Sequence, residues 1–90
     1  MNRYVHRKLT KIDRIDKFYL EAHLLLMRQA GQFTLDDIFA EMDAKCDETV
    51  EFDFIKDVVM HELNDFLNKG TIGYIEKNIY ECTLIKQSTI

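Results

Sequence analysis

The sequence predicts a single small domain that is mainly α-helical and ends in a β-hairpin. Three observations lead to this fold class. The chain of 90 residues contains no proline and only three glycines, and so few helix breakers favour helices over many short strands. Three segments repeat apolar residues at spacings of three and four, the period of an amphipathic helix. After Gly70, two short runs are rich in β-branched and aromatic residues, as strands are.

The first predicted helix covers residues 10–30. Thr10 and Asp13 have the spacing of a capping box, in which a hydroxyl and an acid satisfy backbone N–H groups of the first turn. Gly31 follows the segment and can adopt the left-handed conformation that ends many helices. The side chains predicted to face the core are Ile12, Ile15, Phe18, Tyr19, Ala22, Leu25 and Leu26.

The same segment carries a second apolar stripe, formed by Leu20, Leu24 and Met27. At about 100° per residue, these side chains lie on a different side of the helix from Ile15 and Ala22. A helix that is apolar on two sides requires a partner on both. The ends of the same chain could fold over the stripe, or a second subunit could cover it. We expect a homodimer interface at these three residues.

The second and third predicted helices follow from caps and periodicity. The second begins at Thr34, where Thr34-Leu35-Asp36-Asp37 again resembles a capping box. The third begins near residue 52 or 53, with Asp53 as a candidate N-cap, and ends at Lys69-Gly70. The predicted core of the second helix is Leu35, Ile38, Phe39 and Met42. The predicted core of the third is Ile55, Val58, Val59, Leu63, Phe66 and Leu67.

Residues 71–76 and 79–85 are the two predicted strands. Lys77-Asn78 between them is a two-residue turn in which asparagine tolerates a positive φ. An isolated hairpin is marginally stable, so this one should pack on the helices. The expected organisation is a basic N-terminal arm at 1–9, one domain at 10–86 and a C-terminal tail at 87–90.

This order of elements, together with one local motif, resembles the winged helix-turn-helix superfamily. In such domains the third helix often ends with a leucine, an apolar residue three positions later, a glycine four further on and an isoleucine two after that. The matching positions are Leu63, Phe66, Gly70 and Ile72, with Tyr80 and Leu84 in the returning wing strand. The resemblance extends over residues 10–85 and implies a three-helix winged helix-turn-helix fold.

The resemblance also implies DNA binding in transcriptional control, because the third helix of such domains commonly enters the major groove while the wing contacts the backbone. Lysine and arginine side chains would contact phosphates, and two asparagines on the third helix could each bind an adenine edge. The implied nucleic-acid-binding residues are Arg3, Arg7, Lys8, Lys56, Asn64, Asn68, Lys77 and Asn78.

The charge distribution leads to a second hypothesis. Residues 1–17 contain six basic and two acidic residues, whereas the rest of the chain contains six basic and fourteen acidic ones, for a net charge of −4. The outer side of the third helix would carry Asp53, Asp57 and Asp65, which phosphates repel. The alternative to DNA binding is therefore a winged-helix interaction module whose acidic third helix meets a basic protein partner.

The sequence contains no pattern typical of an enzyme, a cofactor site or a metal site. His61-Glu62-Leu63-Asn64-Asp65 lacks the second histidine of the His-Glu-x-x-His zinc signature. Residues 1–11 lack the apolar run of a signal peptide, and the longest apolar run, at 24–27, is too short to cross a bilayer. We therefore expect a cytoplasmic protein without membrane contact, in which Cys46 and Cys82 are reduced and buried.

Overall fold

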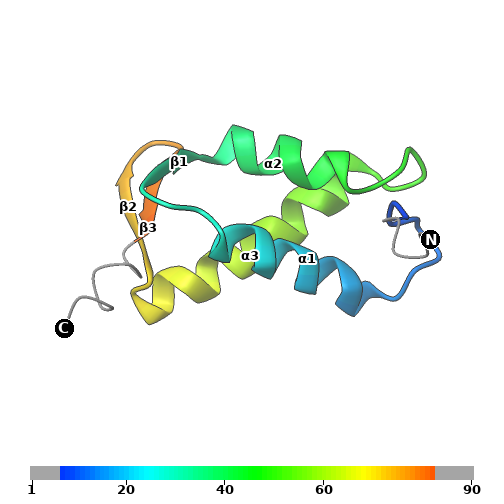
Figure 1. The fold of residues 1–90 in the computed structure, drawn as a ribbon, viewed down its shortest axis with the longest axis horizontal. Helices are drawn as coiled ribbons and strands as arrows, with labels where there is room; N and C mark the ends of the chain where they lie inside the picture. The colour runs from blue at the N-terminus through cyan, green and yellow to red at the C-terminus, as the bar shows by residue number, and fades with distance from the viewer. Residues whose placement is uncertain (1–6, 83–90) are drawn as a thin grey trace, which may run out of the picture.

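A computed structural model describes residues 7–82, which form three helices and a three-stranded antiparallel sheet (Figure 1). The elements are α1 (Ile15–Met27), β1 (Gln32–Thr34), α2 (Leu35–Ala44), α3 (Phe52–Lys69), β2 (Ile72–Glu76) and β3 (Ile79–Cys82). The predicted mainly α fold with a terminal hairpin is confirmed. The order of the elements is compatible with a winged-helix topology.

The three helices pack around one apolar core to which every helix contributes. The fully buried side chains are Ala22, Leu25 and Leu26 of α1, Ile38 and Met42 of α2, and Ile55, Val58, Val59 and Leu63 of α3. Phe39 and Leu67 pack against the edge of this core rather than inside it. The core stripes predicted for the second and third helices are therefore correct in position, and these two residues mark their borders.

A helix cap, a helix end and a turn that the sequence predicts are present in the structure. Thr34 caps α2, because its Oγ1 accepts a hydrogen bond of 3.2 Å from the Asp37 backbone N–H. Gly70 ends α3 in the left-handed conformation, with φ of 79°. Asn78 takes a φ of 66° in the turn between β2 and β3.

The predicted start of the first helix is wrong, since α1 begins at Ile15 and not at residue 10. The Asp13 carboxylate accepts hydrogen bonds from the Thr10 backbone N–H at 2.7 Å and the Thr10 hydroxyl at 3.2 Å, which closes a separate turn. Arg14 is extended and interrupts the helical path. Ile12 and Ile15 were predicted to face the core, but their exposed fractions are 89% and 56% because the turn directs them to solvent.

Two further corrections concern element boundaries. The N-cap position of α3 is Glu51, and Asp53 lies inside the first turn, where its charge favourably meets the positive end of the helix dipole. The sequence also gave no sign of β1, which pairs with β3 and makes the sheet three-stranded, in the order β1-β3-β2. Within this pairing, the Phe33 ring stacks on the Tyr80 ring at 6.1 Å between centroids.

The cysteines of the described region are free and buried, as expected. Burial, followed by the neighbouring charges of Asp43 and Asp47, raises the pKa of the Cys46 thiol to about 11. No helix among residues 7–82 is long and apolar enough to span a bilayer.

Candidate nucleic-acid interface

The predicted DNA-contacting residues fall in separate parts of the molecule. Figure 1 places the N-terminal segment and the sheet at opposite ends of the helices. Arg3 lies outside the described residues. The others lie in the N-terminal segment (Arg7, Lys8), along α3 (Lys56, Asn64, Asn68) and at the turn of the hairpin (Lys77, Asn78). The structure therefore does not bring the predicted contacts together on one continuous surface.

The outer side of α3 is acidic, and each of the two lysines of the helix lies beside an aspartate. Its exposed side chains opposite the core are Asp53, Asp57, His61, Asn64 and Asn68. Lys56 Nζ lies 3.9 Å from Asp53 Oδ1, and Lys69 Nζ lies 3.0 Å from Asp65 Oδ2. Both bases of α3 thus pair with acids of the same helix, at spacings of three and four residues. Phosphate groups would meet an acidic surface here.

The histidine that begins the zinc-like sequence of α3 serves helix packing. The His61 ring meets the Tyr19 ring edge-on, with 5.0 Å between centroids. The neighbouring Glu62 Oε1 lies 3.3 Å from His23 Nδ1, and the His23 ring stacks on Phe66. Among residues 7–82, no group of three histidine, cysteine, aspartate or glutamate side chains is placed to hold a metal ion. These polar side chains join α1 to α3.

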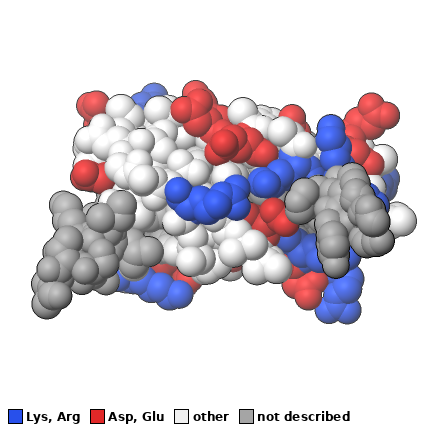
Figure 2. All heavy atoms as spheres, in the orientation of Figure 1, with Lys and Arg blue, Asp and Glu red and all other residues white. Residues whose placement is uncertain are grey.

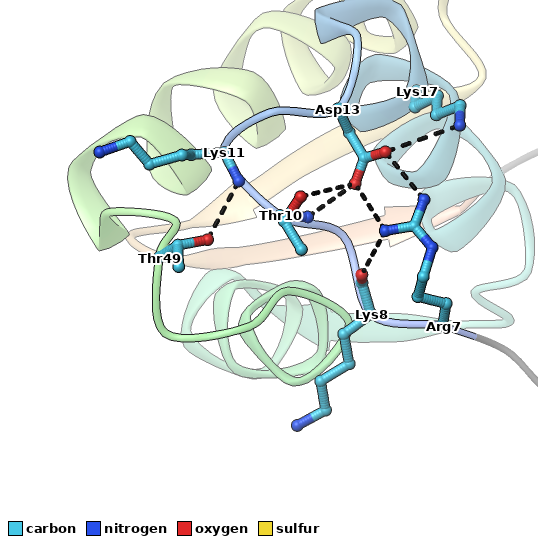
Figure 3. Close-up of polar contacts among 7 residues, drawn as sticks. All are labelled: Arg7, Lys8, Thr10, Lys11, Asp13, Lys17 and Thr49. Carbon is cyan, nitrogen blue, oxygen red and sulfur yellow. Dashed lines mark hydrogen bonds and ion pairs between the residues drawn. The ribbon is translucent and has the colours of Figure 1, made fainter.

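Asp13 organises the bases of the N-terminal segment (Figure 3). The Arg7 guanidinium binds the Asp13 carboxylate through two nitrogens, at 2.9 and 3.3 Å, and Lys17 Nζ lies 3.7 Å from the same carboxylate. The hydrogen bonds from Arg7, followed by that from the Thr10 backbone, hold the pKa of Asp13 well below its ordinary value. Asp13 is therefore charged at neutral pH, and part of the positive charge of Arg7 is already neutralised.

Backbone hydrogen bonds fix the same segment to the loop after α2. The Leu9 N–H donates to the Lys45 carbonyl at 2.9 Å, and the Asp47 N–H donates to the Leu9 carbonyl at 2.8 Å. Two residues after Leu9, the Lys11 N–H donates to Thr49 Oγ1 at 3.0 Å (Figure 3). Residues 9–11 consequently follow the body of the domain and hold Lys8 beside it.

An open groove lies between α1, this segment and the end of α2, and we name it the basic groove. It is lined by Arg7, Lys8, Leu9, Glu21, Leu24, Arg28, Ala44 and Lys45. Four of these side chains are basic and one is acidic. Figure 2 shows basic groups across the middle of this face and toward the N-terminal end, while acidic groups stand along the edge formed by α2. The chain is acidic overall, but the lining of this groove is basic.

The second apolar stripe of α1 borders the basic groove. Leu20, Leu24 and Met27 have exposed fractions of 55%, 38% and 46%, and they lie on the side of α1 opposite its buried side chains. Leu24 belongs both to the stripe and to the lining of the groove. The described part of the chain thus leaves the stripe largely open to a partner, and that partner would sit next to the basic groove.

We compared the chain with known protein families, curated proteins and solved structures. No protein-family model matches the chain, and no curated protein or solved structure shows significant similarity to it. The likeness to winged-helix proteins therefore rests on the order of the elements and on the motif at the end of α3.

Proposed function

We propose that the protein is a homodimeric winged-helix protein that binds double-stranded DNA in transcriptional control. The succession of α1, β1, α2, α3 and the hairpin supports membership of the winged helix-turn-helix superfamily. The observation that carries DNA binding is the separation of charge. Residues 7–28 contain six bases against three acids, whereas residues 29–82 contain four bases against thirteen acids. A chain that segregates its bases in this way keeps a surface on which a polyanion can bind.

The open stripe on α1 supports the homodimer. A contact between two copies of the same helix is self-complementary, because each copy offers the same apolar residues to the other. Leu20, Leu24 and Met27 would become buried in both copies at once, which doubles the apolar area removed from water.

Binding to a fluorescent, mixed-sequence DNA duplex tests the DNA part of this proposal. We expect an affinity that falls steeply as the salt concentration rises from about 50 to 200 mM, since Lys and Arg contacts release counterions from DNA. Replacing Arg3, Arg7 and Lys8 by alanine should weaken the binding. An absence of binding at about 50 mM salt, or an affinity unchanged in that variant, would contradict the proposal.

The protein-interaction module is the second candidate, and the acidic outer side of α3 favours it. A basic protein partner would meet Asp53, Asp57 and the neighbouring asparagines there. Purification from the native cell separates the candidates. A stoichiometric basic partner that no longer co-purifies after Asp53→Asn and Asp57→Asn supports the interaction module. Co-purifying DNA that survives these two changes supports the DNA-binding protein.

A further inference from the structure

We propose that the basic groove beside α1, and not α3, holds the phosphate backbone of duplex DNA. This inference rests on the proposed DNA-binding function and names the surface that performs it. The residues assigned to phosphate contact are Lys8, Arg28 and Lys45. Two of them, Arg28 and Lys45, have no place among the contacts that the winged-helix resemblance implies.

The groove contains two bases without an ion pair in the described region, whereas each lysine of α3 lies beside an aspartate of the same helix. Lys8 and Arg28 are exposed and form no ion pair with another residue of the described region. Lys45 keeps 35% of its side chain exposed and lies 3.8 Å from Glu21 Oε1, a long and solvent-screened pair. A phosphate can therefore attract all three. On α3, Lys69 lies in a shorter pair, 3.0 Å from Asp65, while the Lys56–Asp53 pair at 3.9 Å is as solvent-screened as that of Lys45.

The groove is also held in shape before any ligand arrives. The two backbone hydrogen bonds of Leu9 fix one wall to residues 45–47, and the Arg7–Asp13 pair fixes the chain just before and after that contact. Arg7 Nη1 also donates to the Lys8 carbonyl at 3.4 Å. Arg7 is thus a positioning residue, which orders the backbone that carries Lys8. Preformed positions for the cations lower the entropy lost on binding.

Duplex DNA is favoured over a small anion by the symmetry of the proposed dimer. In an antiparallel pair of α1 helices that meet at Leu24, the two-fold axis is perpendicular to both helices. The flank of α1 that carries Glu21 and Arg28 then faces the same way in both copies. Two basic grooves open on one side of the dimer, related by a two-fold axis. The two backbones of a DNA duplex have the same symmetry.

Two of the three bases also have a structural role. Arg28 and Lys45 occupy the C-cap positions of α1 and α2, where a positive charge is stabilised by the helix dipole. A base with that role alone would alter the melting temperature without altering the salt dependence of DNA binding. The test therefore has to measure both quantities.

The test compares two variants that each lose three positive charges. The groove variant replaces Lys8, Arg28 and Lys45 by glutamine. The matched control replaces Lys56, Lys69 and Lys77 by glutamine, which changes α3 and the hairpin but leaves the groove intact. Because the variant chain occurs twice in a dimer that uses both grooves, six phosphate contacts are lost, and we expect the slope of log affinity against log salt to fall by about 5, with an affinity loss of at least about a hundredfold near 0.1 M salt. The control should keep most of its affinity and slope.

The outcomes separate this inference from the proposed function. If the wild-type protein does not bind duplex DNA, both are wrong. If it binds and the two variants lose the same affinity, or only the control loses it, DNA binding stands and the groove assignment is overturned. If circular dichroism shows that the groove variant is unfolded, the single variant Arg28→Gln decides, with an expected slope change of about 1.8 per dimer that Arg28→Lys should restore. An unchanged slope in Arg28→Gln overturns the assignment.

Discussion

Truncating the apolar stripe of α1 should dissociate the dimer without unfolding the monomer. The change is Leu20, Leu24 and Met27 to alanine in one chain. These side chains are 55%, 38% and 46% exposed within the protomer, so the core of the domain depends little on them. The same exposed area is what a second copy would bury. The substitution should therefore weaken dimerisation while leaving the free energy of unfolding of the monomer nearly unchanged.

The expected magnitude follows from the exposed fractions. Together they amount to about 1.4 complete side chains per protomer, and full burial of one leucine or methionine contributes about 1.5–3 kcal/mol. Because each residue occurs twice in a two-fold dimer, the stripe would contribute about 4–8 kcal/mol. Alanine retains Cβ, about a quarter of each side chain, so we expect a loss of about 3–6 kcal/mol, which is a rise in Kd of at least about a hundredfold.

Sedimentation equilibrium over a wide range of protein concentration measures this change. The matched control is Ile75→Ala, which truncates an apolar side chain on β2 that is 43% exposed and lies away from α1. The control should dimerise like the wild type, and chemical denaturation should show similar monomer stability for all variants. The dimer interface on α1 is refuted if the wild type is monomeric at every concentration. It is also refuted if the triple variant dimerises as tightly as the control.

Three further predictions concern the protomer itself. Asp13→Asn should lower the denaturant midpoint at neutral pH. Because Arg7 lowers the folded-state pKa of Asp13, the carboxylate stabilises the folded protein fully above about pH 4. The difference in unfolding free energy between wild type and variant should narrow as the pH falls further. A difference that does not depend on pH would contradict this. Gly70→Ala places a side chain at φ of 79° and should cost about 1–2 kcal/mol of unfolding free energy in thermal denaturation. Gly73→Ala, where the new Cβ meets open space and φ is not positive, should cost clearly less, and equal losses would refute the conformational explanation. Cys46 should resist alkylation at pH 8 in the folded protein and react on unfolding, because its pKa of about 11 keeps it a thiol; rapid labelling of the native protein would contradict its burial.

The parts of the fold that the sequence predicts are those fixed by a few neighbouring residues. The cap at Thr34, the left-handed Gly70 and the positive φ of Asn78 each depend on the intrinsic chemistry of one or two side chains. The capping-box pattern at Thr10 and Asp13 predicted a helix start that is wrong, because the Asp13 carboxylate closes a separate turn and binds Arg7. Nothing within four residues distinguishes that turn from the start of a helix.

The strand β1 and the basic groove depend on contacts between distant segments. Three residues are too few to show alternation, and Gln32–Thr34 becomes a strand because β3 pairs with it. Arg28 and Lys45 reach Lys8 only through the packing of α1 and α2. By contrast, the Asp65–Lys69 pair has the i, i+4 spacing of a helical ion pair, a local signal from which it could have been predicted.

An NMR titration of the isotope-labelled protein with a mixed-sequence DNA duplex locates the DNA-binding surface, because it reports on every backbone amide at once. If the basic groove binds DNA, the largest chemical-shift changes occur at Lys8, Arg28 and Lys45, and they disappear as salt is added. Amides of the outer side of α3, such as Asn64 and Asn68, should shift little. Large shifts confined to α3 and the hairpin, or no shifts at low salt, would contradict it.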